Sequence, residues 1–114
     1  MFKGLGAMGD MAKMMKAAKD MQTRMTSLQE DLARITVTGE SGAGLVQATA
    51  TAKGELTALS IDPSIFVASE KEVVEDLILA AIKDAQKRAA EKTQEEMGKL
   101  AAEMGLPAGM NLPI

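Results

Sequence analysis

Residues 11–35, MAKMMKAAKDMQTRMTSLQEDLARI, carry apolar residues whose spacing alternates between three and four positions. These residues are Met11, Met14, Ala18, Met21, Met25, Leu28, Leu32 and Ile35. That spacing predicts one narrow apolar stripe along a helix, as in the seam of a coiled coil. A helix of about 25 residues is roughly 37 Å long, which is too long for a domain of this size to bury completely. Part of the stripe must therefore face a neighbouring helix, a second copy of the chain or solvent.

The segment that follows changes from a helical period of about 3.6 to a period of 2, which is typical of β-strands. The sequence predicts strands over residues 35–40, 45–52 and 56–62, joined by short turns. The connector Ser41–Gly44 suits a glycine-rich hairpin turn. On the second strand alanines alternate with polar residues, so a helix could pack closely on the alanine face.

A second long helix is predicted over residues 70–104, where a glycine and a proline end it. The fold class is therefore α+β over residues 10–104, with a long N-terminal helix, a three-stranded antiparallel meander and a long C-terminal helix. Residues 1–9 are expected to form a flexible arm, and residues 105–114 a flexible tail rich in proline and glycine. Three short strands leave two open edges and cannot cover two such helices, so we expect a homodimer.

The composition argues against an enzyme. The chain has no cysteine and no histidine, which removes thiolate nucleophiles, the commonest general base and the commonest metal ligand. The segment Gly39–Gly44 resembles a phosphate loop, but it lies between two predicted strands and no lysine follows it, so a turn is favoured. Acidic pairs such as Glu75-Asp76 lie on predicted amphipathic helices, where a solvated face is the simpler interpretation. We expect no catalytic residues, no metal, no cofactor and no small-molecule substrate.

The sequence also predicts where the protein resides. No apolar run approaches the roughly 20 residues that span a bilayer. The N-terminus lacks the uninterrupted apolar core of a secretion signal. The absence of cysteine fits a reducing compartment. We therefore expect a soluble protein of the cytoplasm that does not act at a membrane.

The net charge of −3 is unevenly distributed along the chain. Residues 1–28 carry a net charge of +3, and residues 29–82 carry −6. The charge returns to +2 over residues 83–92 and falls to −2 over residues 93–114. Two basic stretches, both on predicted helices, thus flank an acidic middle. Local potential matters more than the whole-chain charge for an anionic partner.

The basic side chains of these two stretches are the candidate binding residues. Rows of lysine and arginine on a helix can follow phosphates, and they supply affinity rather than sequence specificity. Binding of single strands normally uses stacking aromatic residues, and the chain has only two phenylalanines. Duplex DNA is therefore the expected partner. The candidates are Lys13, Lys16, Lys19, Arg24, Lys83, Lys87, Arg88 and Lys92.

Methionine suggests an alternative function. Six of the ten methionines fall between Met8 and Met25. The simpler interpretation is a helix–helix seam that uses methionine. The alternative is an adaptor whose methionine-rich seam docks partner helices, because methionine repacks easily. The lack of aromatic anchors weakens that alternative.

Several motifs occur in an order that resembles a known family. The motifs are V-T-G-E-S-G-A-G-L-V (Val37–Val46), I-D-P-S (Ile61–Ser64), E-D-L (Glu75–Leu77) and Lys87-Arg88. Together with the methionine-rich basic first helix and the proline-containing C-terminus, they resemble the YbaB/EbfC family of bacterial nucleoid-associated proteins. The chain departs from that pattern in its acidic balance and its few aromatic residues.

The resemblance implies a tweezer-like homodimer whose long helices project from a shared α/β body and hold duplex DNA. It places Lys16 and Arg24 at basic positions of the first helix, and Lys87 and Arg88 at paired basic positions of the last helix. The other four candidates depend on the charge pattern alone. The sequence as a whole thus predicts a dimeric, non-enzymatic DNA-binding protein of the bacterial nucleoid.

Overall fold

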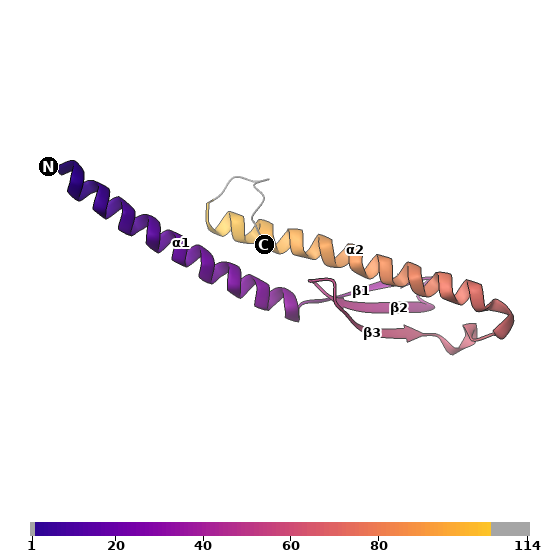
Figure 1. Ribbon diagram of the computed structural model, residues 1–114. Coiled ribbons are helices and arrows are strands. Elements are labelled where there is room, and N and C mark those ends of the chain that lie inside the picture. Colours follow the sequence, from indigo (N-terminus) through magenta and orange to yellow (C-terminus); the bar gives the residue numbers. More distant parts are fainter. Residues whose placement is uncertain (1, 106–114) are drawn as a thin grey trace.

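The protein is a long, thin rod. The computed structural model describes the backbone of residues 2–105 and the side chains of residues 9–105. Its principal extents are 84 × 22 × 18 Å, and its radius of gyration is 21.8 Å. A compact domain of this length would have a radius of gyration of about 13 Å. Two long helices, one of them projecting past the other, account for the difference (Figure 1).

The first helix, α1, spans Phe2–Arg34 and therefore begins earlier than the predicted start near residue 10. Asp10, at the predicted start of the domain, lies inside this helix. The glycines at positions 4, 6 and 9 led to the later start. Each glycine disfavours a helix by only about 1 kcal/mol, and the leucine, alanine and methionine between them are good helix formers. The flexibility of residues 1–9 stays a prediction, and the tail beyond Gly105 lies outside the described residues.

The three strands confirm the predicted antiparallel meander. They are β1 (Thr36–Ser41), β2 (Val46–Thr51) and β3 (Leu56–Ile61), in the order β1-β2-β3. A turn joins β1 to β2, with Gly42 at φ +59° and Ala43 at φ +55°, so the glycine-rich segment is a hairpin turn and opens no helix. Short 3₁₀ helices, η1 (Pro63–Ile65) and η2 (Ala68–Glu70), lead from β3 to the second long helix.

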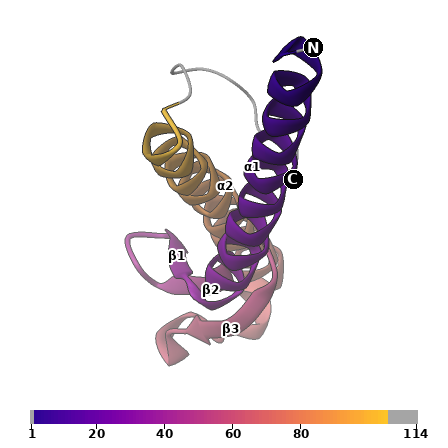
Figure 2. The ribbon, with the colours of Figure 1, turned by 90° about the vertical axis from the view of Figure 1, so that its left-hand side faces the viewer.

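The second helix, α2 (Lys71–Glu103), packs its first half over β1 and β2 (Figure 2). Ala81 and Ala85 are fully buried against Ala48 and Ala50 of β2. Gly39 of β1 lies beneath them, and a Cβ atom there would come within 2.6 Å of the Ala85 Cα atom. The alanine face of β2 therefore permits the predicted close approach. Gly39 of β1 also makes this close approach possible, and the sequence pattern did not indicate that role.

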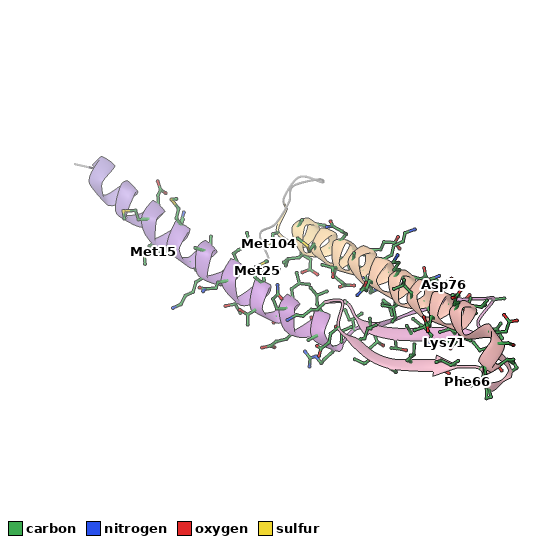
Figure 3. The ribbon with its side chains drawn as sticks, turned by 45° about the vertical axis from the view of Figure 1, so that its right-hand side comes forward. Met15, Met25, Phe66, Lys71, Asp76 and Met104 are labelled. Atoms are coloured by element: carbon green, nitrogen blue, oxygen red, sulfur yellow. The ribbon has the colours of Figure 1, made fainter. Side chains whose placement is uncertain are left out.

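The second half of α2 packs against α1 rather than against the sheet. Leu28 and Leu32 of α1 are buried with Leu100 and Ala101 of α2. Methionines from both helices, among them Met25 and Met104, surround this cluster (Figure 3). The apolar stripe of α1 is thus a helix–helix seam over its C-terminal half.

The N-terminal half of the stripe has no cover among the described residues. Helix α1 continues past the end of α2 (Figure 1). Met11 and Met14 of the stripe are 62% and 70% exposed, and the neighbouring Met15 is 72% exposed. The predicted seam therefore divides into a packed half and an open half.

Candidate nucleic-acid interface

Three lysines lie on the projecting part of α1. Lys13, Lys16 and Lys19 are exposed, and none of them makes an ion pair with any residue that the structure describes. A helix advances about 1.5 Å per residue, so the three charges span roughly 9 Å. Their ammonium groups can meet an external anion without breaking an ion pair to the described part of the chain.

Arg24 lies nearer to the body and is already paired. Its Nη1 atom lies 3.4 Å from Oε2 of Glu103, so this ion pair links α1 to the end of α2. The two residues line a cleft of about 240 Å³ between the helices, together with Glu96 and Lys99. An incoming phosphate would compete with the Glu103 carboxylate for Arg24.

Two lysines of α2 point away from the sheet. Lys83 and Lys87 are one turn apart and exposed, while Ala81 and Ala85 on the other side of the helix are buried. Neither lysine makes an ion pair within the described part of the chain. They form a second set of available charges.

Arg88 is held in place by Asp84. The Nε atom of Arg88 donates to Oδ2 of Asp84 at 3.1 Å, and the same oxygen accepts a hydrogen bond from the backbone N–H of Glu40 at 2.9 Å. The Glu40 N–H, helped by the Arg88 guanidinium, lowers the pKa of Asp84. The terminal nitrogens of Arg88 make no hydrogen bond to any described residue, so they stay available to a second anion.

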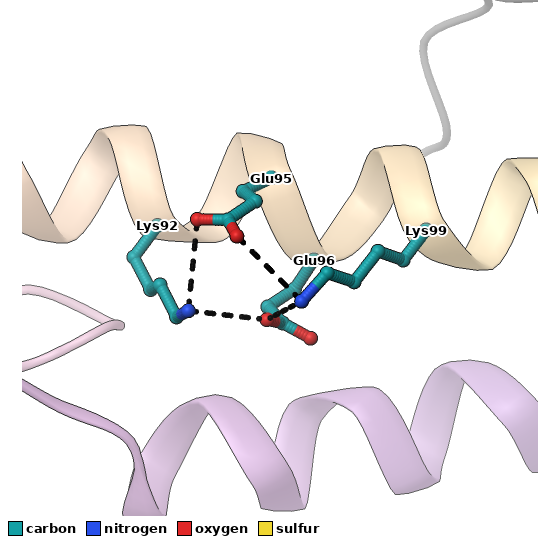
Figure 4. Close-up of polar contacts among 4 residues, drawn as sticks. All are labelled: Lys92, Glu95, Glu96 and Lys99. Carbon is teal, nitrogen blue, oxygen red and sulfur yellow. Dashed lines mark hydrogen bonds and ion pairs between the residues drawn. The ribbon is translucent and has the colours of Figure 1, made fainter.

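Lys92 belongs to a network of four charges on α2 (Figure 4). Its Nζ atom lies 3.6 Å from Oε2 of Glu95 and 3.4 Å from Oε1 of Glu96. Lys99 approaches both carboxylates, at 3.6 and 3.1 Å. The Lys99 ammonium lowers the pKa of Glu96, and the Glu96 carboxylate raises the pKa of Lys99. The two ammonium groups and the two carboxylates neutralise each other, so Lys92 offers little net charge to a partner.

The opposite end of the rod is acidic. The first turns of α2 carry Glu72, Glu75 and Asp76, all exposed, and Lys71 pairs with Glu75 at 3.7 Å (Figure 3). The charge segregation seen in the sequence is therefore also a segregation in space. A polyanion would meet attraction at the projecting end of α1 and repulsion at the start of α2.

The described residues meet neither the requirements of a metal site nor those of a membrane-spanning helix. Within residues 9–105, no group of three or more acidic side chains is placed to hold a metal ion. Among the described helices, none is both long and apolar enough to cross a membrane.

Comparison with known proteins identifies the family. The sequence matches the YbaB/EbfC DNA-binding family over residues 8–104. The chain belongs to this family. The match includes both long helices, apart from the first residues of α1, and the whole sheet.

Two known proteins are similar to this chain in sequence and in fold. A nucleoid-associated protein of Agrobacterium fabrum, Atu0095, is 43% identical over 106 residues, which cover 93% of this chain and 99% of that protein. The crystal structure of an uncharacterized protein from Helicobacter pylori, HP0035, superposes with a TM-score of 0.62 at 26% identity. That match covers 82% of this chain and 94% of the other. The predicted family and fold are thereby confirmed.

In this YbaB/EbfC chain the eight basic candidates form two sets rather than one patch. Four lie on α1 between positions 13 and 24, and four lie on α2 between positions 83 and 92. Arg24 reaches Glu103, and Lys92 lies roughly 17 Å back along α2 from that point at about 1.5 Å per residue. The two sets therefore follow one another along the rod.

The sequence analysis did not identify the carboxylates that form ion pairs with three of these candidates. The spacing of Asp84 to Arg88, and of Lys92 to Glu96, is the four-residue spacing of helical ion pairs, so both contacts could have been recognised. The pairing of Arg24 with Glu103 joins residues far apart in the chain, and no local pattern indicates it.

Proposed function

We propose that this protein is a non-enzymatic component of the bacterial nucleoid in the cytoplasm, which binds duplex DNA as a homodimer, mainly through phosphates. The observation that carries this function is the set of exposed lysines on the projecting end of α1, which make no ion pair to a described residue. Membership of a DNA-binding family supports the same partner.

The ion pairs rank the eight candidates. Lys13, Lys16 and Lys19 on α1, with Lys83 and Lys87 on α2, make no ion pair to a described residue and should contribute most. Arg24, Arg88 and Lys92 already contact carboxylates. A phosphate must displace or share those carboxylates, so the net gain from each contact is smaller.

The open face of β3 supports the homodimer. Leu59 pairs with Ala48 of β2, so it points to the same side of the sheet as the buried core. Helix α2 covers β1 and β2 but leaves Leu56 and Leu59 of β3 43% and 48% exposed. A second copy related by a two-fold axis would bring the same leucines against each other, because a two-fold interface is self-complementary.

Light scattering after size-exclusion chromatography tests the dimer. The wild-type protein should elute as a dimer, and Leu59→Glu should give a monomer because it places a charge on the apolar face. Ser60 pairs with Gln47 on the other face of the sheet, so Ser60→Glu is the matched control and should stay dimeric. A wild-type monomer at micromolar concentration would overturn the architecture.

A salt titration of DNA binding tests the phosphate contacts. If each subunit neutralises about three phosphates, the logarithm of the affinity of a dimer should fall against the logarithm of salt with a slope of about −5. A flat titration would contradict the proposal.

A triple variant tests the assignment of the lysines. Lys13→Gln, Lys16→Gln and Lys19→Gln together should weaken DNA binding by about tenfold or more at low salt, because each removes a phosphate contact. The control replaces Lys53, Lys71 and Lys99 by Gln, which changes the net charge equally at positions away from the projecting end. Equal losses from the two triple variants would show a general charge effect instead of a site.

The exposed methionines of α1 favour an adaptor as the second candidate. In an adaptor the lysines only keep the helix soluble. Replacing Lys87 and Arg88 by Ala separates the two functions. Weaker DNA binding with an intact dimer supports the first proposal, and unchanged DNA binding supports the adaptor.

A further inference from the structure

The open half of the methionine stripe is a surface that DNA binding does not use. Met11, Met14 and Met15 are 62–72% exposed, and Ala18 is exposed beside them. We call these four residues the open stripe. Helix α2 ends at Glu103, so it does not extend along this part of α1 (Figure 3).

Lys13 and Lys16 lie on the side of α1 opposite the open stripe, and Lys19 lies on its flank, about 40° from Met15. Successive residues of a helix turn by about 100°, which places Lys16 roughly 160° from Met14 and roughly 140° from Met11. A duplex held by Lys13 and Lys16 therefore lies on one side of the helix. The methionines remain in solvent on the other side.

We infer that the open stripe binds the open stripe of a second DNA-bound copy, so that two α1 helices pair back to back and bridge two duplexes. This inference rests on the proposed DNA binding. In such a pair each copy turns Lys13 and Lys16 outward, away from the other copy. Each outward face then has room for a duplex of its own.

The chemistry of the packed half of the stripe favours a second copy as the occupant. The open stripe continues directly into Met21 and Met25, which pack, like Met97 and Met104 of α2, against the buried cluster between the two helices. Methionines of both helices thus already line the packed half of this seam. A second copy offers the same flexible, unbranched side chains at the same helical spacing, and methionine adapts readily to such a surface.

Charge and area make the pairing dependent on DNA. Lys13, Lys16 and Lys19 outnumber Asp10 and Asp20 on this part of α1, so two free arms repel each other. Phosphates that neutralise the lysines remove that repulsion. Stable interfaces bury about 1,200–2,000 Å², which four small or unbranched side chains on each copy cannot supply alone. The contact should therefore form between copies that DNA already holds near each other.

A bridging assay tests this inference. An immobilised duplex is loaded with protein, and the retention of a second, fluorescent duplex is measured. The wild type should retain the second duplex. Met11→Ala, Met14→Ala and Met15→Ala together should reduce that retention at least several-fold, while the affinity for a single duplex changes less than about twofold. Alanine keeps the helix. Val73→Ala with Leu79→Ala, at exposed apolar positions of α2, is the control.

The outcomes separate the inference from the function on which it rests. Binding of one duplex without retention of a second overturns the bridging and leaves the proposed function intact. Equal retention by the triple methionine variant and the wild type also overturns it. Failure of the wild type to bind any duplex contradicts the proposed function itself.

Cross-linking gives an independent test, because the chain has no cysteine of its own. The variant Met14→Cys should be joined between copies by a short bis-maleimide only when DNA is present. The variant Asp20→Cys, on the lysine side of α1, should not. If the thiol introduced at position 14 is unreactive towards maleimide without DNA, another part of the chain covers the stripe. That result, or cross-linking independent of DNA, overturns the inference.

Discussion

Helices α1 and α2 are both 33 residues long, yet they use their apolar faces differently. Ala81 and Ala85 of α2 are fully buried against the sheet, whereas Met14 at the free end of α1 is 70% exposed. Small residues fix the position of α2 on the sheet. Larger, flexible residues leave the end of α1 ready to meet other molecules. The same secondary structure therefore serves as a scaffold in one region and as a contact surface in the other.

The largest expected effect contrasts the two halves of the α1 stripe. Leu32 is 2% exposed, so Leu32→Ala should lower the free energy of unfolding by about 3 kcal/mol through lost burial and a cavity. Met14→Ala should change it by less than about 0.5 kcal/mol because the side chain is already in solvent. Urea denaturation at a fixed protein concentration measures both. Equal losses would mean that the open half is packed in solution.

A second prediction concerns the close approach of α2 to β1. A Cβ atom at position 39 would lie 2.7 Å from the carbonyl oxygen of Ala81, and backbone atoms cannot move aside easily. Gly39→Ala should therefore destabilise the fold by about 2 kcal/mol. Gly98→Ala is the control, because nothing lies within 4 Å of that position and alanine favours a helix. Thermal melting should move down for the first variant and up for the second.

A third prediction uses the acid titration of Asp84. The pKa of this carboxyl is lowered in the folded state by the N–H of Glu40 and the guanidinium of Arg88. Its contribution to stability is therefore complete above the unfolded pKa of about 3.9 and is lost as the pH falls through the folded pKa. The wild type should melt above Asp84→Asn at pH 7, and the difference should shrink below pH of about 4. A constant difference from pH 7 down to acid would contradict this role.

The smallest expected effect concerns the ion pair between the helices. Glu103→Gln removes the carboxylate that pairs with Arg24 and should raise DNA affinity about twofold at low salt. Stability should change by less than about 0.5 kcal/mol because the pair is exposed. Glu55→Gln makes the same charge change in the turn before β3 and serves as the control. An equal gain from both variants would assign the effect to net charge.

Local patterns predicted the elements of this fold well. The change in hydrophobic period near Ile35 marked the end of α1, and the turn residues at 41–44 marked the hairpin. The start of α1 was predicted too late because glycine lowers helix propensity without forbidding a helix. The division of the stripe was not predictable, because it depends on how far α2 runs beside α1.

The interface was predicted only in part, because it too depends on contacts between elements that are distant in the sequence. Charge patterning selected the basic residues and indicated duplex DNA, and the family resemblance supported the same partner. Which of them are free depends on side-chain contacts, such as that of Arg24 with Glu103, that arise only in three dimensions. The role of Gly39 likewise depends on Ala81 and Ala85, which lie more than forty positions further along the chain.

The length of the rod sets how much DNA one copy can occupy. A chain 84 Å long, aligned with a duplex that rises about 3.4 Å per base pair, overlaps roughly 25 base pairs. The candidate lysines without an ion pair to a described residue occupy only short parts of that length, roughly 9 Å between positions 13 and 19 and roughly 6 Å between positions 83 and 87, or about four to five base pairs together. Most of the DNA that a copy covers would thus be excluded from other proteins without being contacted. Competition between copies for space along the duplex, more than the affinity of each copy for DNA, would then limit how densely the protein coats a chromosome.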